Sequence, residues 1–326
     1  MDDYKSLTIP FAGGKSYRLL GRARQTEKDV LLDWSADGVE FSIDCEGTIA
    51  VTAYTSGSQK NTYKLRVIVD GVVGDRVIFP WGTTTLDAFT GVAPGVHTIR
   101  IVKDSALMYA EERLLSVTVR AKEGTMKATA PKEKLLEVIG DSISCGYGIM
   151  PTDTPETTMN TASSVLTFGY RVAEALNMDY ELAVKGSLGF VHKAGKPVER
   201  DMFEIYPYQN RYRDTETRYD FPRKADLILQ ALGSNDGDVP DDVLEDAVRR
   251  FTAQLREIHG EHVPIVYMYG MMNSKIGWLY EKLAKELPDS YALQVTENRL
   301  GAGHHPTLEG QERFAEEALT LVRKLI

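Results

Sequence analysis

The spacing of apolar residues changes near residue 130, and this change constrains the fold more than any other feature of the sequence. Before it, apolar and polar residues alternate in short runs that are separated by turn residues such as Asp70-Gly71. The clearest runs are residues 39–55, 63–79, 95–105 and 114–124. Period-two alternation of this kind predicts an antiparallel β-sandwich.

After residue 134, short and almost wholly apolar runs alternate with longer runs of helical periodicity. The short runs are residues 134–140, 180–186, 225–232, 263–270 and 291–296. The helical runs are residues 163–177, 241–260, 274–288 and 308–326. This alternation predicts an α/β fold with a doubly wound parallel sheet and helices on both faces.

The length of 326 residues exceeds what one typical core supports, so two domains are expected. We place the β-sandwich in residues 1–122 and the α/β domain in residues 135–326. Residues 123–134 are polar, contain glycine and proline, and are predicted to be the linker.

Composition narrows the classes of partner. The net charge of −9 argues against nucleic acid or an anionic membrane as a partner, since both require a basic surface. No apolar run approaches the roughly 20 residues that span a bilayer. The N-terminus lacks the features of a signal peptide, and the only cysteines are Cys45 and Cys145, so a cytoplasmic location is expected. A chain trimmed of its leader would look the same and would be secreted, and a homo-oligomer is left open.

Polar residues directly follow the predicted parallel strands. They are Asp141 and Ser142 after the first strand, Gly186 after the second, Asn235 after the third, and His304 and His305 before the last helix. Because ligands of open parallel sheets lie beyond the carboxyl ends of the strands, these groups are expected to converge on one rim. A hydroxyl, a histidine base and N–H donors for an oxyanion are the parts that ester hydrolysis needs.

These residues also carry a family resemblance. "GDSISCGYG", the lone Gly186, "LGSND" and the final "HHP" resemble the four blocks of the SGNH (GDSL-type) hydrolases, in the expected order. The whole chain is more closely similar to carbohydrate esterase family two, which carries a jelly-roll domain before its SGNH domain. The resemblance therefore implies an all-β jelly roll followed by a flavodoxin-like, doubly wound parallel sheet.

The resemblance implies an activity and a role for each site residue. The activity is removal of acetyl groups from sugar hydroxyls, with no metal and no cofactor. Ser142 would be the nucleophile and His305 the base. The backbone N–H groups of Ser142 and Gly186 and the side-chain amide of Asn235 would form the oxyanion hole.

Two departures from the family pattern matter. Many relatives have aspartate two residues before the catalytic histidine, where this chain has Gly303. The leading interpretation is a Ser–His dyad whose imidazole is held by a backbone carbonyl, with Glu309 or Asp141 as alternative orienters of His305. The second departure is His304, where relatives often carry an aromatic residue that lines the sugar site.

His304 and Trp81 are the candidate substrate contacts. His304 could instead be the base, with His305 structural. Ser142 with Asp141 could merely cap a helix, and Asn235 could be an ordinary turn residue. Surface positions are expected for His192, His259 and His262, and core positions for Trp34, Trp278 and, with less weight, Trp81.

Three functions are compatible with these observations. The preferred one is a serine esterase that deacetylates small acetylated saccharides derived from xylan or mannan. The second is a lipase or thioesterase that acts on longer acyl chains, which is disfavoured because residues 193–223, the predicted border of the site, are polar and rich in tyrosine. The third is a carbohydrate-binding protein without catalytic activity.

Overall fold

The computed structural model describes residues 3–57, 63–106, 110–151, 158–193, 196–197, 200–209, 217–272 and 275–326. The chain divides into two compact units, Met1–Pro131 and Lys132–Ile326. The division falls within the segment predicted as the linker. That segment is not entirely irregular, because β11 (Lys127–Ala128) pairs with β5 (Gly38–Thr55) of the first unit.

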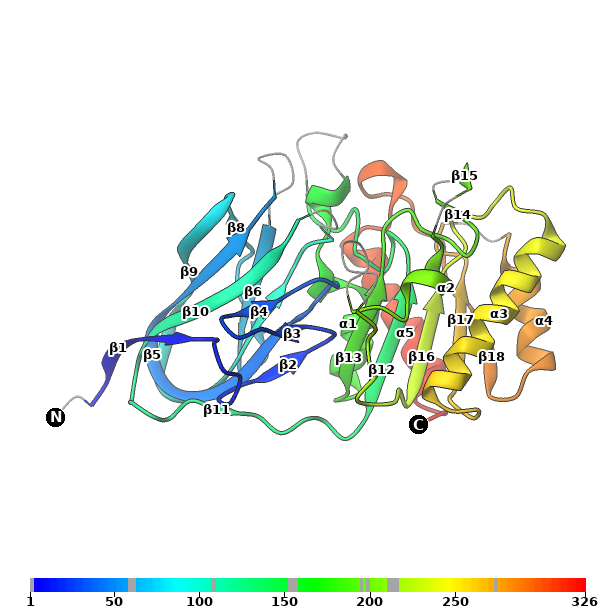
Figure 1. Cartoon of the computed structure of the whole chain (residues 1–326). Coiled ribbons are helices and arrows are strands. Elements are labelled where there is room, and N and C mark those ends of the chain that lie inside the picture. Colours follow the sequence, from blue (N-terminus) through cyan, green and yellow to red (C-terminus); the bar gives the residue numbers. More distant parts are fainter. Residues whose placement is uncertain are drawn as a thin grey trace. The chain divides into compact units, whose positions relative to one another are not determined.

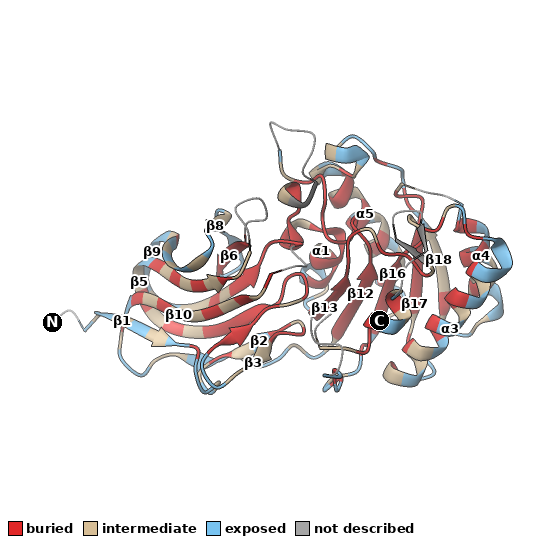
Figure 2. Ribbon diagram, turned by 45° about the horizontal axis from the view of Figure 1, so that its top comes forward, coloured by how far each residue is buried: buried red, intermediate tan, exposed pale blue. Residues whose placement is uncertain are grey.

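The first unit is an antiparallel sheet built around two long strands, β5 and β9 (Gly82–Lys103) (Figure 1). The other strands are β1 (Lys5–Pro10), β2 (Arg18–Leu20), β3 (Arg24–Gln25), β4 (Val30–Leu31), β6 (Tyr63–Val69), β7 (Val72–Val73), β8 (Val77–Phe79) and β10 (Glu112–Ala121). Buried and less buried residues alternate along β5 and β10, as Figure 2 shows. The buried side chains form one apolar core, so the β-sandwich expected from the period-two pattern is confirmed.

The predicted Asp70-Gly71 turn joins β6 to β7. Asp70 has φ 49° and Gly71 has φ 82°, and Val69 pairs with Val72 across the turn. Two consecutive residues of positive φ are the signature of a type I′ turn, which matches the twist of the strands that it joins.

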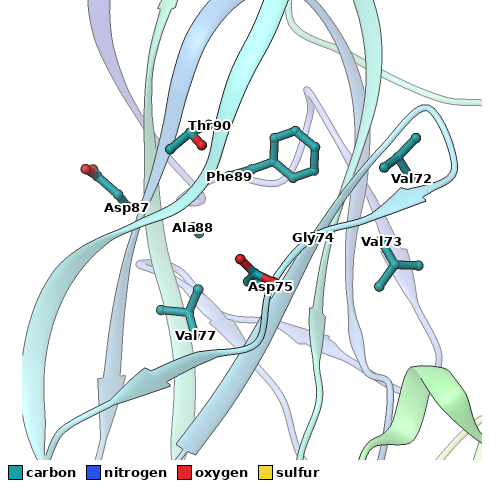
Figure 3. Close-up of a pocket in the computed structure, with 9 residues that line it drawn as sticks. All are labelled: Val72, Val73, Gly74, Asp75, Val77, Asp87, Ala88, Phe89 and Thr90. Atoms are coloured by element: carbon teal, nitrogen blue, oxygen red, sulfur yellow. The ribbon is translucent and has the colours of Figure 1, made fainter.

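A hollow on this unit lies between the β7–β8 connection and β9 (Figure 3). The ring of Phe89 is directed toward the loop that carries Gly74, where a Cβ would lie 2.7 Å from the ring. Asp75 and Asp87 also line the hollow. It shares no residue with the site predicted from the sequence.

The second unit contains a parallel sheet of five strands. They are β12 (Leu135–Gly140), β13 (Asp179–Val184), β16 (Leu227–Ala231), β17 (Ile265–Tyr269) and β18 (Ser290–Gln294). Their spatial order is β13-β12-β16-β17-β18, and every neighbouring pair is parallel. This is the 2-1-3-4-5 order of flavodoxin-like sheets, so the predicted fold class is confirmed.

Helices cover both faces of this sheet. The helices are α1 (Phe168–Ala175), α2 (Met202–Ile205), α3 (Asp241–His259), α4 (Gly277–Glu286) and α5 (Leu308–Val322). The unit also contains three 3₁₀ turns, η1 (Thr158–Thr161), η2 (Ser164–Leu166) and η3 (Ala302–His304), and a small hairpin of β14 (His192–Lys193) and β15 (Lys196–Pro197). α1 and α5 pack together, and Figure 1 shows α3 on the other side of the sheet. In the described parts of the chain, no helix is long and apolar enough to cross a bilayer.

The strand order places the site. The chain leaves β12 toward β13 on one side and later returns to β16 on the other side, so the order reverses between β12 and β16. A crevice for ligands forms outside the carboxyl ends of the strands at such a switch point. Ser142, Gly186 and Asn235 each follow one of these three adjacent strands closely.

Candidate active site

Ser142 lies in a tight turn immediately after β12. Backbone N–H groups close this turn: Cys145 donates to Asp141 at 3.0 Å, and Tyr147 donates to Ser142 at 3.1 Å. Gly146 within it has φ +81°, and a Cβ there would lie 2.4 Å from the carbonyl oxygen of Ser163. A buried apolar strand is thus followed by a polar turn rich in glycine, because the chain must reverse at once to hold the hydroxyl at the strand's tip.

Gly148 brings the serine turn close to the histidine loop. It has φ +85°, and a Cβ there would lie 2.9 Å from the Cβ of His305 and 2.9 Å from the carbonyl oxygen of Pro306. Only glycine satisfies both the left-handed backbone and this close approach.

We expect Gly148→Ala to lower kcat/KM for nitrophenyl acetate by about tenfold to a hundredfold, because it pushes His305 away from the serine. The matched control is Gly124→Ala, since Gly124 has φ +73° but nothing within 4 Å of its would-be Cβ. Both variants should lose some thermal stability through backbone strain, and only the first should lose activity. Equal activities of the two variants would contradict this account of Gly148.

The imidazole of His305 contacts the serine hydroxyl, with His305 Nε2 lying 2.8 Å from Ser142 Oγ. His305 Nδ1 lies 3.0 Å from the backbone carbonyl oxygen of Gly303. A carbonyl oxygen only accepts, so Nδ1 donates its proton to it, and Nε2 of the neutral ring is left to accept from the hydroxyl. This is the tautomer that a general base at Ser142 requires.

The carboxylates considered as alternative orienters have other partners. Glu309 is exposed and pairs with Arg313 at 3.2 Å. Asp141 accepts hydrogen bonds from the backbone N–H of Ile143 at 3.0 Å and from Asn235 Nδ2 at 3.3 Å. The residue that contacts Nδ1 is Gly303 itself, the one that stands in the position of the family's aspartate.

A short left-handed loop directs His305, and not His304, toward the serine. Gly303 has φ 61° and His304 has φ 60°. The loop is closed by the N–H of Gly301, which donates to the carbonyl of His305 at 2.7 Å. Thr307 then caps α5 by accepting from the N–H of Gly310 at 3.2 Å. His304 is left exposed beside His305.

Burial lowers the pKa of His305 below its ordinary value of 6.5, and the backbone hydrogen bonds from its loop oppose that shift. The neutral ring therefore persists to lower pH than in an exposed histidine. A histidine that is to act as a base must be neutral before it can take a proton.

An NMR titration of the His305 ring protons should show this shift directly. We expect a midpoint below the ordinary value of about 6.5, with the ring neutral at neutral pH and protonated as the pH falls through that midpoint. Signals are assigned by their absence in His305→Ala. A midpoint above 6.5 would show that a negative charge, rather than burial, dominates the environment of the ring.

The predicted oxyanion donors lie on the loops after β13 and β16. Gly186 has no room for a side chain, because a Cβ there would lie 2.5 Å from the hydroxyl of Tyr147. Asn235 Nδ2 donates to the carbonyl of Leu188 at 3.2 Å and to Asp141. The structure thus joins the loops of Ser142, Gly186 and Asn235 into one cluster, and their service as an oxyanion hole stays a prediction.

Comparison with known proteins fits this arrangement. Residues 19–128 match the family described as carbohydrate esterase 2 N-terminal. A solved family two carbohydrate esterase from Clostridium thermocellum, in complex with cellohexaose, shares the fold with a TM-score of 0.83 at 20% identity, over 95% of this chain and 98% of that one. In its N-terminal sequence and in its fold, this chain is similar to the family two carbohydrate esterases.

The curated proteins to which this chain is similar are longer than the chain. The acetylxylan esterase / glucomannan deacetylase of Cellvibrio japonicus is 24% identical over 221 residues, which are 67% of this chain and 61% of that protein. The cellulase/esterase CelE of Acetivibrio thermocellus is 26% identical over 205 residues, which are 62% of this chain and 24% of that protein. The chain therefore spans less than two thirds of each relative's length.

Two residues of the candidate site were not singled out from the sequence. The ring of Tyr147 lies 5.4 Å from that of His305, centroid to centroid, and fills the space beside Gly186. Gln311 is fully buried in α5, donates to the carbonyl of Ile143 at 2.9 Å and accepts from the N–H of Phe168 at 3.0 Å. Gln311 had a sequence signal, because it is the polar member of the apolar face of α5.

Other histidines of the chain lie outside the site. The surface position expected for His259 is wrong, because its ring is buried, lies 2.6 Å from the hydroxyl of Tyr206 and accepts from the N–H of Ala225. His262 is exposed as expected, and the side chain of His192 lies outside the described residues. Among the residues that the structure describes, no cluster of His, Cys, Asp or Glu could hold a metal ion.

The core position expected for tryptophan is confirmed only for Trp34. Trp81 is 72% exposed and Trp278 is 42% exposed, because one lies in the loop before β9 and the other on the outer side of α4. Contact of Trp81 or His304 with a sugar stays a prediction.

The tyrosine-rich border expected over residues 193–223 is described only in part, since residues 194–195, 198–199 and 210–216 lie outside the description. Within the described part, Tyr206 and Tyr219 are buried, and Tyr219 donates to Glu181 at 2.6 Å. These two tyrosines serve packing rather than an open border.

Proposed function

We propose that this protein is a serine esterase that removes O-acetyl groups from acetylated sugars and oligosaccharides derived from xylan or mannan. The observation that carries the proposal is the Ser142 hydroxyl within 2.8 Å of His305 Nε2, at the switch point of a flavodoxin-like sheet. The name of the Cellvibrio japonicus relative, acetylxylan esterase / glucomannan deacetylase, supports an acetylated polysaccharide as the source of the substrate, and the name of the other relative supports an ester.

Acylation begins when His305 Nε2 takes the proton of the Ser142 hydroxyl as its oxygen attacks the acetyl carbonyl. The carbonyl oxygen gains negative charge and is stabilised by the N–H groups of Ser142, Gly186 and Asn235. The imidazolium then gives its proton to the sugar oxygen as the ester C–O bond breaks. The deacetylated sugar leaves, and acetyl-Ser142 remains.

Deacylation repeats the sequence with water. His305 takes a proton from water, the hydroxide oxygen attacks the acetyl-serine carbonyl, and the proton returns to Ser142 as acetate leaves. Throughout, the Gly303 carbonyl holds Nδ1 and keeps Nε2 directed at the serine. His304, exposed beside the base, is proposed to contact the sugar.

We also propose a cytoplasmic location, in which the substrate is an imported oligosaccharide rather than intact polymer. Cys45 and Cys145 are buried and form no disulfide bond, which suits a reducing compartment. Recovery of the protein from the periplasm or medium in a fractionation experiment would contradict this.

Acetate release from a panel of acetylated xylo-, manno- and gluco-oligosaccharides tests the proposed function. NMR of the products identifies the sugar position that is cleared. A series of nitrophenyl esters of rising acyl length, run in parallel, should show acetyl preferred to octanoyl. No acetate from any member of the panel, together with sugar binding, would favour a binding protein; preference for octanoyl would favour a lipase or thioesterase.

A further inference from the structure

Asp141 is a fully buried carboxyl group beside the serine. One of its oxygens accepts from the N–H of Ile143 at 3.0 Å, within the serine turn. The other accepts from Asn235 Nδ2 at 3.3 Å, on a loop 94 residues further along the chain. The group therefore links the loop of the nucleophile to the loop of a predicted oxyanion donor.

The turn alone does not explain a carboxyl group at this position. Burial raises the pKa of Asp141 to about 7, and hydrogen bonds from Ile143 and from the side chain and backbone of Ser234 oppose that shift. A serine could cap the same N–H without so large a desolvation cost. A serine would lack the second carboxyl oxygen, and with it the capacity to accept from Ile143, Ser234 and Asn235 together.

The amide of Asn235 needs acceptors that fix its direction. A carboxamide has two orientations of nearly equal shape, one of which presents N–H groups and the other an oxygen. Asp141 and the carbonyl of Leu188 both face Nδ2, so both favour the orientation with nitrogen on this side. Both hydrogen bonds, at 3.3 and 3.2 Å, are longer than the usual N···O distance of about 2.9–3.0 Å and are therefore weak. One N–H of Asn235 can thus turn toward a stronger acceptor, such as the charged oxygen of the proposed tetrahedral intermediate.

We propose that Asp141 is a positioning residue, which selects the orientation of the Asn235 amide that donates to the oxyanion. The inference rests on the proposed ester hydrolysis. In a rotated amide, the carbonyl oxygen of Asn235 would face the developing negative charge and oppose it. Asp141 acts through Asn235 and does not itself contact the substrate.

Two substitutions of Asp141 distinguish orientation of the Asn235 amide from support of the serine turn. Asp141→Asn keeps the shape but can offer an N–H to Asn235 instead of an acceptor. Asp141→Ser keeps an acceptor for Ile143 but is too short to reach Asn235. Each should lower kcat for nitrophenyl acetate by about ten- to a hundredfold with KM changed less than about threefold. The matched control is Asp179→Asn, a nearly buried aspartate at the start of β13, which should keep kcat close to wild type.

A double-mutant cycle decides whether the effect passes through Asn235. Asn235→Ala alone should lower kcat about a hundredfold or more, and adding Asp141→Asn should lower it less than about threefold further. Losses that multiply would overturn the proposal, since they would show that Asp141 acts by another route. Thermal unfolding of each variant confirms that the assayed protein is folded.

An NMR readout is independent of activity. The side-chain amide signals of Asn235, assigned by their absence in Asn235→Ala, should shift and exchange faster with solvent in both Asp141 variants and stay in place in Asp179→Asn. Unchanged signals in the Asp141 variants would overturn the proposal even if kcat falls. If the wild type hydrolyses no ester, the proposed function fails, and the amide signals still decide whether Asp141 holds Asn235.

Discussion

Ser142→Ala should reduce kcat for nitrophenyl acetate by about 10⁴-fold or more and leave the protein folded. The substitution removes the oxygen that would attack the ester and that, among the hydrogen bonds of the described residues, is the hydroxyl that contacts His305 Nε2. The turn should survive, because its closing bonds run between backbone groups, such as the N–H of Tyr147 and the carbonyl of Ser142. Steady-state kinetics and thermal unfolding of the purified variant measure both consequences.

The same turn offers a control serine. Ser144 is buried two residues further on, and its hydroxyl has no hydrogen-bond partner in the described structure. Ser144→Ala should keep kcat within about threefold of wild type. Wild-type activity in Ser142→Ala, or an equal loss in both variants, would show that the ester is cleaved elsewhere or that the turn tolerates no change.

The fold could be predicted from periodicity because each element has only one way to bury its apolar residues. The run at residues 225–232 is apolar except for Asp226 and Gln230, as is typical of a strand covered on both faces, and it contains β16. Residues 241–260 have one apolar face and became α3. Since the carboxyl ends of parallel strands share a rim, the meeting of Ser142 with the histidine loop followed from the order of the elements.

The same periodicity would have placed His259 correctly. It lies four residues after Leu255 and eight after Phe251, both buried, and therefore on the inner face of α3. Its polarity and its place before Gly260 suggested the surface instead. Burial is achieved because Tyr206 and the backbone of Ala225 supply partners for the ring, and neither contact can be inferred from local sequence.

The hydrogen bond between Asp141 and Asn235 also could not be predicted from the sequence. It joins side chains 94 residues apart, and it depends on how closely two loops approach after the sheet has formed. The sequence indicates which residues follow the strands. It does not indicate which carboxyl oxygen faces which amide, because that is fixed by distances of a few tenths of an ångström.

Gly303 shows how a missing side chain can be replaced by backbone. The left-handed φ of 61° belongs to the loop in which the carbonyl of Gly303 lies 3.0 Å from His305 Nδ1. A neutral carbonyl stabilises an imidazolium less than a carboxylate would, since hydrogen bonds to charged acceptors are roughly twice as strong. The lowered pKa of His305 agrees with such a neutral partner.

His305→Ala should reduce kcat for nitrophenyl acetate by about 10⁴-fold or more, because the Ser142 hydroxyl then lacks a base and stays protonated at neutral pH. The loss should fall on kcat rather than KM, since the imidazole acts on the reacting atoms. The control His262→Ala removes an exposed imidazole that pairs with Asp289. Both residues precede the amino ends of strands β17 and β18, whereas the site lies beyond the carboxyl ends, so the variant should keep kcat within about threefold.

A comparison of His304→Ala with His305→Ala decides which of these two histidines is the base. His304→Ala should retain kcat for nitrophenyl acetate within about tenfold of wild type, because the ring that contacts Ser142 Oγ, at 2.8 Å, belongs to His305. Its loss should appear instead with acetylated oligosaccharides, as a raised KM. If His304→Ala were inactive on nitrophenyl acetate and His305→Ala retained wild-type kcat, the base would be His304. The loop that contains Gly303 would then have to adopt another backbone conformation in solution, in which His304 rather than His305 faces the serine.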